Sequence, residues 1–382
     1  MNSQNIKEQA LQFHREKKGK VEISSKVKFD NLADLGMVYT PGMAYATEEI
    51  TKDKSKVNEY TMRPRSVAIV SDGSAVLGYG NIGPEAGLPV MEGKSLIFKK
   101  FANLDGFPLC ISSRSVDEIV RFCEMIEPTF GAIHLEDIKA PECFEVESRL
   151  KESLSIPVLH DDQHGTAVVV LAGIINSLKV VNKQIENCKI IVNGAGAAGT
   201  AITKLLLEYG AKDITVLDSR GVMFKGRERM NKYKDALVEI TNPNENRGSL
   251  NDNLVDADIF IGVSVGDLLK ADHIKSMAKE PIVFALANPV PEINYDVAKE
   301  AGAAVMGTGR ADYPNQVNNV LAFPGLFKGI LDAGKKEFTS SILIAAAKNL
   351  AAIVKEPNGD RVIPTAFEEG VAEAVAKGIS EM

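Results

Sequence analysis

The feature that most constrains the fold of this chain is a glycine loop between a strand-like and a helix-like segment. Residues 189–193 are an apolar, β-branched run, and residues 200–209 follow a helical pattern. Between them the chain reads Gly194-Ala195-Gly196-Ala197-Ala198-Gly199. A second strand is expected over residues 214–217, and it ends in Asp218, 19 positions beyond Gly199. Glycines alone are weak evidence, but this order of strand, loop, helix and acidic residue is typical of a dinucleotide-binding unit.

Each glycine of the loop has a physical role in this interpretation. The first permits the tight turn, the second lets a pyrophosphate approach the backbone, and the third lets the helix pack on the strand. The first N–H groups of the helix favour the anion. The alternative is a plain βα turn without a ligand. Asp218 is expected to accept hydrogen bonds from the adenosine ribose, which favours NAD, whereas Arg220 offers a contact for the 2′-phosphate of NADP.

The rest of the chain alternates short apolar runs with helical patterns, which predicts an α/β fold with mostly parallel sheets. A chain of 382 residues exceeds the size of a single core, so two domains are expected. We predict an N-terminal β/α domain over residues 1–160, a Rossmann-type doubly wound domain over 161–330 with a connector helix over 166–181, and C-terminal helices over 331–382. A hairpin of residues 66–71 and 75–78 is expected early in the first domain.

Charge, cysteine spacing and hydropathy exclude several classes of protein. The formal net charge of -7 and the pI near 5.5 argue against a nucleic-acid-binding surface. The four cysteines are scattered without a C-x-x-C pair, so we expect reduced thiols and no disulfide framework. No run reaches the roughly 20 apolar residues of a membrane span, and the N-terminus has no signal-peptide pattern. We therefore expect a cytoplasmic enzyme that contacts neither nucleic acid nor membrane.

Two apolar runs end in paired carboxylates. Residues 131–135 lead into Glu136 and Asp137, and residues 157–160 lead into Asp161 and Asp162. If both runs are parallel strands, their ends meet at one sheet edge and supply oxygen ligands for Mg²⁺ or Mn²⁺. An acidic pair alone is as often a helix cap or a solvated turn. His160 and His164 suggest zinc, but no third nitrogen or sulfur ligand is within sequence reach.

Further motifs occur in a fixed order along nearly the whole chain. They are Tyr39-Thr40-Pro41-Gly42, Gly93-Lys94, the two acidic corners, the glycine loop, Ala287-Asn288-Pro289, and Asn318-Asn319 before Phe323-Pro324-Gly325. In this combination the chain resembles malic enzymes of the small-subunit bacterial type. The resemblance implies metal-dependent oxidative decarboxylation of L-malate to pyruvate and CO₂, with reduction of NAD or NADP.

The resemblance also implies roles for single residues. Glu136, Asp137 and Asp162 match the metal ligands of the family. Tyr39 matches its general acid, and Lys94 matches its general base, which also contacts the substrate. Asn288, Asn318 and Asn319 match asparagines that contact substrate, and Asn288 also matches a cofactor contact. Asp161 is expected to act outside the metal coordination sphere, for example by orienting Lys94.

Several alternatives stay open at this point. Larger malic enzymes carry an arginine for the substrate carboxylate between the Asp-Gly turn and the Leu-Gly segment, and residues 72–78 contain none. Backbone amides, Lys99 or the asparagines are candidates for that contact. An amino-acid dehydrogenase or a non-catalytic nucleotide sensor would share the two-domain pattern. We expect a homodimer or a higher oligomer, in which Tyr39 and Lys94 act either within one subunit or across two.

Overall fold

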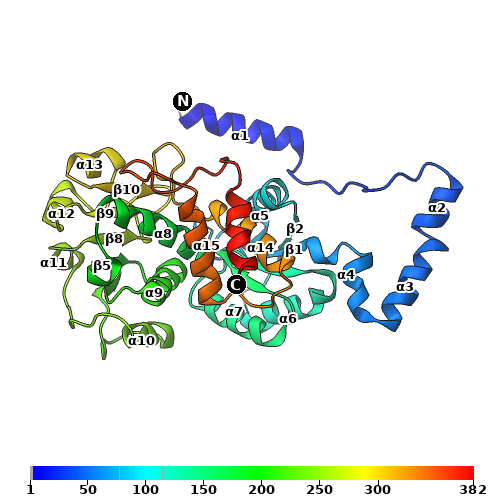
Figure 1. Ribbon diagram of the computed structural model, residues 1–382, viewed down its shortest axis with the longest axis horizontal. Helices are drawn as coiled ribbons and strands as arrows, with labels where there is room; N and C mark the ends of the chain where they lie inside the picture. The colour runs from blue at the N-terminus through cyan, green and yellow to red at the C-terminus, as the bar shows by residue number, and fades with distance from the viewer. Residues whose placement is uncertain (1–2, 77, 114) are drawn as a thin grey trace.

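The computed structural model describes residues 3–76, 78–113 and 115–382, and it contains two open, mainly parallel sheets that lie side by side (Figure 1). The predicted α/β fold with a Rossmann-type sheet is confirmed. The domain limits at residues 160 and 330 stay predictions, because one hydrophobic core cluster runs through both sheets and the C-terminal helices.

The first sheet has the strand order β2-β1-β3-β4, and all of its pairs are parallel. Its strands are β1 (Ser66–Ser71), β2 (Asp105–Cys110), β3 (Ala132–Leu135) and β4 (Val158–His160). The helices of this part are α5 (Pro84–Ile97), η3 (Phe98–Ala102), α6 (Val116–Ile126), η4 (Glu127–Thr129) and α7 (Glu142–Ser153). Side chains alternate along β1: Val67 and Ile69 enter the shared core, whereas Ala68 and Val70 face the cluster formed with α6 and α7.

The predicted hairpin is wrong in its second strand. Val76 forms only an isolated bridge with Gly80, and Leu77 lies outside the described residues. Gly73 has a φ of +64°, and a Cβ there would lie 2.2 Å from the carbonyl oxygen of Gly83. The chain therefore turns tightly after β1 and leads into α5 without a paired strand.

The second sheet has the order β10-β9-β8-β5-β6-β7, and only the short β7 is antiparallel among its described pairs. Its strands are β5 (Lys189–Asn193), β6 (Asp213–Asp218), β7 (Gly221–Val222), β8 (Ile259–Gly262), β9 (Ile282–Ala285) and β10 (Val305–Thr308). Its helices are α8 (Asp161–Val180), η5 (Ile185–Asn187), α9 (Ala197–Tyr209), α10 (Lys232–Val238), α11 (Leu250–Leu254), α12 (Ala271–Ser276) and α13 (Tyr295–Glu300). Strands β6 and β8 flank β5, so the carboxyl end of β5 is the point at which such folds bind ligands.

The C-terminal helices join the two halves. They are η6 (Asn319–Leu321), α14 (Phe323–Asp332), α15 (Ser340–Ala352) and α16 (Val371–Ser380). Helix α14 packs on α16 and η3, and α15 packs on α8. No helix forms between α15 and α16, in a segment that contains Pro357-Asn358-Gly359.

The N-terminal residues form an arm that projects from the body (Figure 1). It contains α1 (Ser3–Lys17), α2 (Leu32–Val38) and α3 (Gly42–Lys52), and η1 (Lys54–Lys56), α4 (Val57–Tyr60) and η2 (Arg63–Arg65) lead into β1. Helices α2 and α3 contain no buried residue. Among the described residues, no helix combines the length and apolar composition needed to cross a lipid bilayer.

Candidate active site

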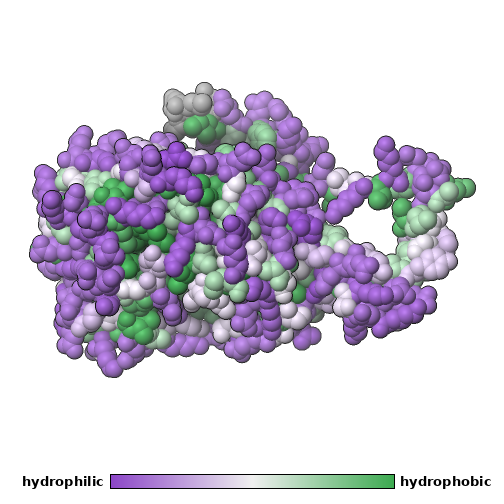
Figure 2. Space-filling model, in the orientation of Figure 1, coloured by the Kyte–Doolittle hydropathy of each residue, from purple (hydrophilic) through white to green (hydrophobic). Residues whose placement is uncertain are grey.

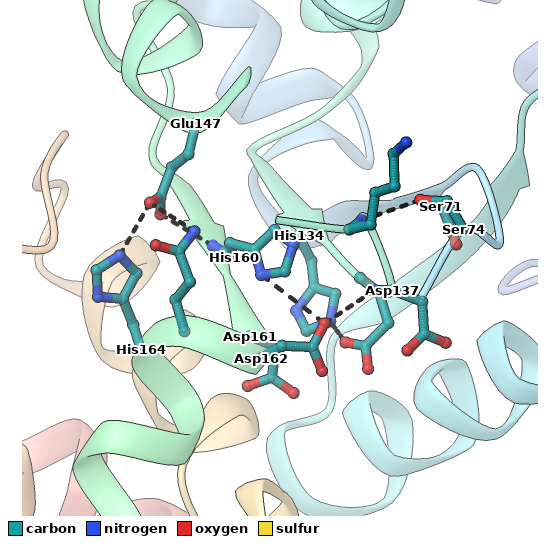
Figure 3. Close-up of polar contacts among 12 residues, drawn as sticks. Ser71, Ser74, His134, Asp137, Glu147, His160, Asp161, Asp162 and His164 are labelled. Atoms are coloured by element: carbon teal, nitrogen blue, oxygen red, sulfur yellow. Dashed lines mark hydrogen bonds and ion pairs between the residues drawn. The ribbon is translucent and has the colours of Figure 1, made fainter. Parts of the chain in front are cut away.

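Four carboxylates, those of Glu136, Asp137, Asp161 and Asp162, meet at the carboxyl edge of the first sheet. Strands β3 and β4 are parallel neighbours with Leu135 opposite His160, so the acidic pairs that follow them lie side by side. One oxygen from each of Glu136, Asp137 and Asp162 lies within 4.8 Å of the others. Figure 3 shows Asp137 and Asp162 facing each other across this edge, where Asp162 Oδ2 accepts the Asp137 N–H at 2.9 Å.

This carboxylate cluster fits a hard divalent cation. All three donors are carboxylate oxygens, which Mg²⁺ and Mn²⁺ prefer. Asp137 Oδ2 is buried and has no hydrogen-bond partner in the described part of the chain. Burial, together with the charges of Glu136 and Asp162, raises the pKa of Asp137 to about 9. Without a cation the cluster therefore tends to retain protons, and a divalent cation would replace them and stabilise the ionised carboxylates.

The raised pKa values predict how stability depends on pH. Burial raises the pKa of Glu136 to about 7 and that of Asp137 to about 9, so the folded protein binds more protons than the unfolded chain. Above about pH 7.5, where most unfolded histidines are neutral, stability should therefore fall as pH rises towards 9. In EDTA we expect a lower Tm at pH 9 than at pH 7.5, by about 1–2 °C for each kcal/mol lost in a chain of this length. Differential scanning fluorimetry with and without Mn²⁺ measures this, and a Tm in EDTA that rises over this interval would contradict the cluster.

Lys94 lies against two of these carboxylates. It is only 8% exposed on α5, and its Nζ lies 2.6 Å from Asp161 Oδ2 and 3.0 Å from Glu136 Oε1. The same nitrogen lies 4.5 Å from the ring centroid of Phe323. Burial alone would lower the pKa of Lys94, but the charges of Asp161, Glu136 and Asp162 outweigh it and raise the pKa. Asp161 thus orients Lys94.

The two aspartates diverge because they belong to a helix. We expected the helix to start at Thr166, but α8 begins at Asp161. Successive helical residues are about 100° apart, so neighbouring side chains point in different directions. Asp162 therefore faces Glu136 and Asp137, while Asp161 faces Lys94.

His134 is a site residue to which the sequence analysis gives no role. It is fully buried on β3, and its Nε2 lies 2.7 Å from Glu136 Oε2. Its ring centroid lies 5.3 Å from those of Phe98, Phe323 and Phe327. Burial lowers the pKa of His134 to about 3, so the imidazole is neutral and supports Glu136. The sequence signal was a polar residue inside an otherwise apolar strand.

The zinc alternative built on His160 and His164 finds no support in the geometry. His164 Nε2 lies 3.0 Å from Glu147, and His160 Nδ1 lies 3.8 Å from Asp162. Within the described residues, neither histidine belongs to a group of three potential ligands.

A cleft of about 1090 Å³ opens at the carboxyl end of β5. Its lining includes Gly194 to Gly196, Asp218 and, from the β3–α7 connection, Ala140 and Pro141. Helix α9 begins at Ala197 and not at residue 200 as predicted, so Ala198 and Gly199 lie in its first turn. A Cβ on Gly199 would lie 1.7 Å from the Gly194 carbonyl oxygen, whereas one on Gly196 would meet no atom within 4 Å. Gly199 thus permits close packing, and Gly196 leaves room for a pyrophosphate.

Asp218 lies at this cleft but is already engaged. Its Oδ1 accepts from the Arg220 N–H at 2.9 Å and from Arg227 at 3.0 Å, and its Oδ2 contacts Arg227 at 2.5 Å and Lys234 at 2.6 Å. Burial would raise the pKa of Asp218, but these contacts outweigh it and lower the pKa. The charge of Asp218, which alone would repel a 2′-phosphate, is therefore compensated by two cations.

The predicted asparagines lie after strand β9 and at the start of η6. Asn288 follows β9 and donates to the Leu286 carbonyl at 3.3 Å. The Asn318 side chain accepts from the Val320 N–H at 3.0 Å at the start of η6. Asn319 lies beside the first turn of α8, since a Cβ on Gly165 would lie 3.3 Å from Asn319 Cβ. Lys99 pairs with Asp105 at the opposite, amino end of β2, so it is a poor candidate for the substrate carboxylate.

Comparisons with known proteins decide the family. A family model described as "Malic enzyme, NAD binding domain" matches residues 163–379, and one described as "Malic enzyme, N-terminal domain" matches residues 18–115 and 112–151. The chain belongs to the malic enzyme family. The resemblance inferred from the motifs is thereby confirmed.

Individual family members agree with this assignment. The chain is 51% identical over 379 residues to the "Bifunctional malic/malolactic enzyme" of Bacillus subtilis, covering 98% of this chain and 92% of that protein. It is 48% identical over 365 residues to the "NAD-dependent malic enzyme" of Geobacillus stearothermophilus, covering 95% and 76%. The crystal structure of the NAD-dependent malic enzyme of Thermotoga maritima superposes with a TM-score of 0.94 at 46% identity, covering 97% and 98%.

One predicted residue of this malic enzyme lies away from the rest. Tyr39 is 61% exposed on the projecting arm, whereas Lys94 is buried in the body. Figure 1 shows α2 and α3 standing apart from α5. A single chain in this conformation does not bring Tyr39 and Lys94 together.

Proposed function

We propose that the chain catalyses the oxidative decarboxylation of L-malate to pyruvate and CO₂, with reduction of NAD or NADP. The observation that carries this proposal is the contact of the buried Lys94 with Asp161 and Glu136, beside the cluster of Glu136, Asp137 and Asp162. This arrangement combines a candidate base with a candidate cation site. The names of the relatives support the same substrate.

The residues of the chain have distinct parts in this proposal. Glu136, Asp137 and Asp162 would hold a divalent cation, which would supply Lewis acidity and offset the negative charge that raises the pKa of Lys94. With that charge offset, Lys94 Nζ can lose its own proton and then accept the proton of the malate C2 hydroxyl, while the bound dinucleotide would take up the C2 hydride. Asp161 keeps Nζ oriented during this transfer. Tyr39 then supplies a proton to C3 after CO₂ has left.

We further propose NAD as the preferred dinucleotide, with limited discrimination against NADP. Two relatives at 46% and 48% identity carry NAD in their printed names. However, Arg227 and Lys234 compensate Asp218, which weakens its repulsion of a 2′-phosphate. Initial rates with L-malate and Mn²⁺, measured with NAD and with NADP, test both statements. A protein that reduces neither dinucleotide under these conditions overturns the proposed function.

The exposed arm supports a homodimer. Its exposed large apolar side chains include Ile23 (95% exposed), Leu32 (85%), Met37 (75%), Tyr45 (68%), Val27 (56%) and Phe29 (54%). Figure 2 shows apolar patches on this projecting part of the surface. Clusters of exposed apolar residues mark interaction sites. We propose that the arm packs on a second copy of the chain and places Tyr39 in the active site of that copy.

We also propose domain limits at residues 160 and 330 and a cytoplasmic location for the protein.

A mixing experiment tests the shared site. Tyr39→Phe and Lys94→Gln should each be nearly inactive alone. If the arm is exchanged, co-expression of the two variants should restore about a quarter of wild-type activity, because half of the dimers are mixed and each contains one intact site. Activity of purified mixed dimers that stays at the level of the single variants would show that Tyr39 and Lys94 act within one subunit.

A further inference from the structure

Glu147 of α7 is a buried carboxylate that the proposed chemistry does not use. It is 5% exposed and has four partners. Oε1 accepts the His160 N–H at 3.0 Å and lies 3.1 Å from Lys151 Nζ. Oε2 lies 3.0 Å from His164 Nε2 and 3.3 Å from Gln163 Nε2. Figure 3 shows Glu147 joined to both His160 and His164.

Three of these partners surround the two functional aspartates in sequence. His160 precedes Asp161 and Asp162, and Gln163 and His164 follow them. Glu147 therefore contacts the residues on both sides of the two aspartates at the start of α8. His160 is the N-cap residue of α8, and no side-chain cap satisfies this helix end. A carboxylate there is favoured by the free N–H groups and by the dipole of a helix 20 residues long.

Glu147 is also kept ionised by its neighbours. Burial would raise the pKa of Glu147, but the neighbouring His164 and Lys151 outweigh burial and lower the pKa. The ionised carboxylate can accept from all four donors at once, which a neutral amide of the same shape cannot do.

We infer that Glu147 is a positioning residue that fixes the first turn of α8, so that Asp162 faces Glu136 and Asp137 while Asp161 faces Lys94. Because both aspartates are on one helical turn, a small rotation of this turn moves both of them. Glu147 does not touch the cation ligands. It acts on the cation site through its contacts with His160, Gln163 and His164. This inference rests on the proposed cation site.

The test measures binding of Mn²⁺ alone to the full-length protein, by the electron paramagnetic resonance of free Mn²⁺. Glu147→Gln should weaken Mn²⁺ binding by about 10- to 100-fold, the usual effect of losing an outer-shell partner of a metal site. Binding of NADH, followed by its fluorescence, should remain at the wild-type level. The matched control is Glu145→Gln, the same substitution on the same helix, where Glu145 pairs with Lys232 at 3.0 Å and does not contact α8; it should leave Mn²⁺ affinity unchanged.

Glu147→Asp covers the case in which Glu147→Gln does not fold. It keeps the charge but shortens the side chain, so it should also weaken Mn²⁺ binding. A folded Glu147 variant with a lower Tm and wild-type Mn²⁺ affinity overturns the inference, because its role would then be structural only. A wild-type protein that does not bind Mn²⁺ instead contradicts the proposed cation site itself.

Discussion

Lys94→Gln should lower kcat for malate oxidation by about 10³-fold, within the range that a positioned general base contributes. The glutamine amide can still hydrogen-bond to Asp161 and Glu136, but it cannot accept the C2 hydroxyl proton. KM for malate should change much less than kcat, because the loss affects the transition state. Steady-state kinetics with saturating Mn²⁺ and NAD provide the measurement.

The same substitution should destabilise the cation-free protein. Lys94 compensates the buried carboxylates of Asp161 and Glu136, and removing one partner of a buried ion pair costs about 3–5 kcal/mol. Circular dichroism at the assay temperature separates this effect from the loss of chemistry. Lys99→Gln is the control, since Lys99 is an exposed lysine that follows the same helix and pairs with Asp105. A folded Lys94→Gln enzyme with near wild-type kcat would remove Lys94 from the proposed chemistry.

Asp162→Asn should abolish most Mn²⁺ binding, with a loss of at least about 10²-fold in affinity and a matching loss of activity at limiting Mn²⁺. The asparagine oxygen can still accept the Asp137 N–H, so the backbone contact at 2.9 Å is preserved. What is lost is one of three negative charges. Isothermal titration with Mn²⁺ measures the affinity directly.

The stability of the cation-free protein should increase, whereas its Mn²⁺ affinity decreases. The charge of Asp162 contributes to the raised pKa of Asp137, so its removal relieves repulsion in the cation-free cluster. Asp162→Asn should therefore raise the Tm in EDTA above that of the wild type. Asp258→Asn is a suitable control, because Asp258 accepts the Lys189 N–H at the amino end of the second sheet, away from the cluster. Unchanged Mn²⁺ affinity in Asp162→Asn would show that the ion binds elsewhere.

The fold and the position of the site were predictable from the sequence where local sequence patterns and strand topology lead to the same structure. The glycine motif of residues 194–199 follows β5 and leads into α9 as predicted, although α9 already begins at Ala197. A strand, a tight turn and a helix are here encoded by adjacent residues. The acidic pairs meet because β3 and β4 are adjacent parallel strands, and the carboxyl ends of such strands lie at one edge.

Other features depend on contacts that sequence patterns do not specify. Asp161 and Asp162 diverge because the helix begins five residues earlier than its apolar pattern indicates. Glu147 and His134 become significant only when helix and strand pack, since that packing buries each polar side chain beside its partners. Arg227 and Lys234 reach Asp218 from the connection and helix that follow β7. In the proposed homodimer, the role of Tyr39 depends on contacts with a second copy of the chain, which sequence patterns do not specify.

Product analysis of a single reaction tests the central claim most directly. Purified protein is incubated with L-malate and NAD, first in EDTA and then after addition of excess Mn²⁺, while NADH, pyruvate and CO₂ are quantified. The account predicts no turnover in EDTA and equal molar amounts of all three products with Mn²⁺. Formation of NADH from malate without pyruvate and CO₂, or full activity in EDTA, would contradict it.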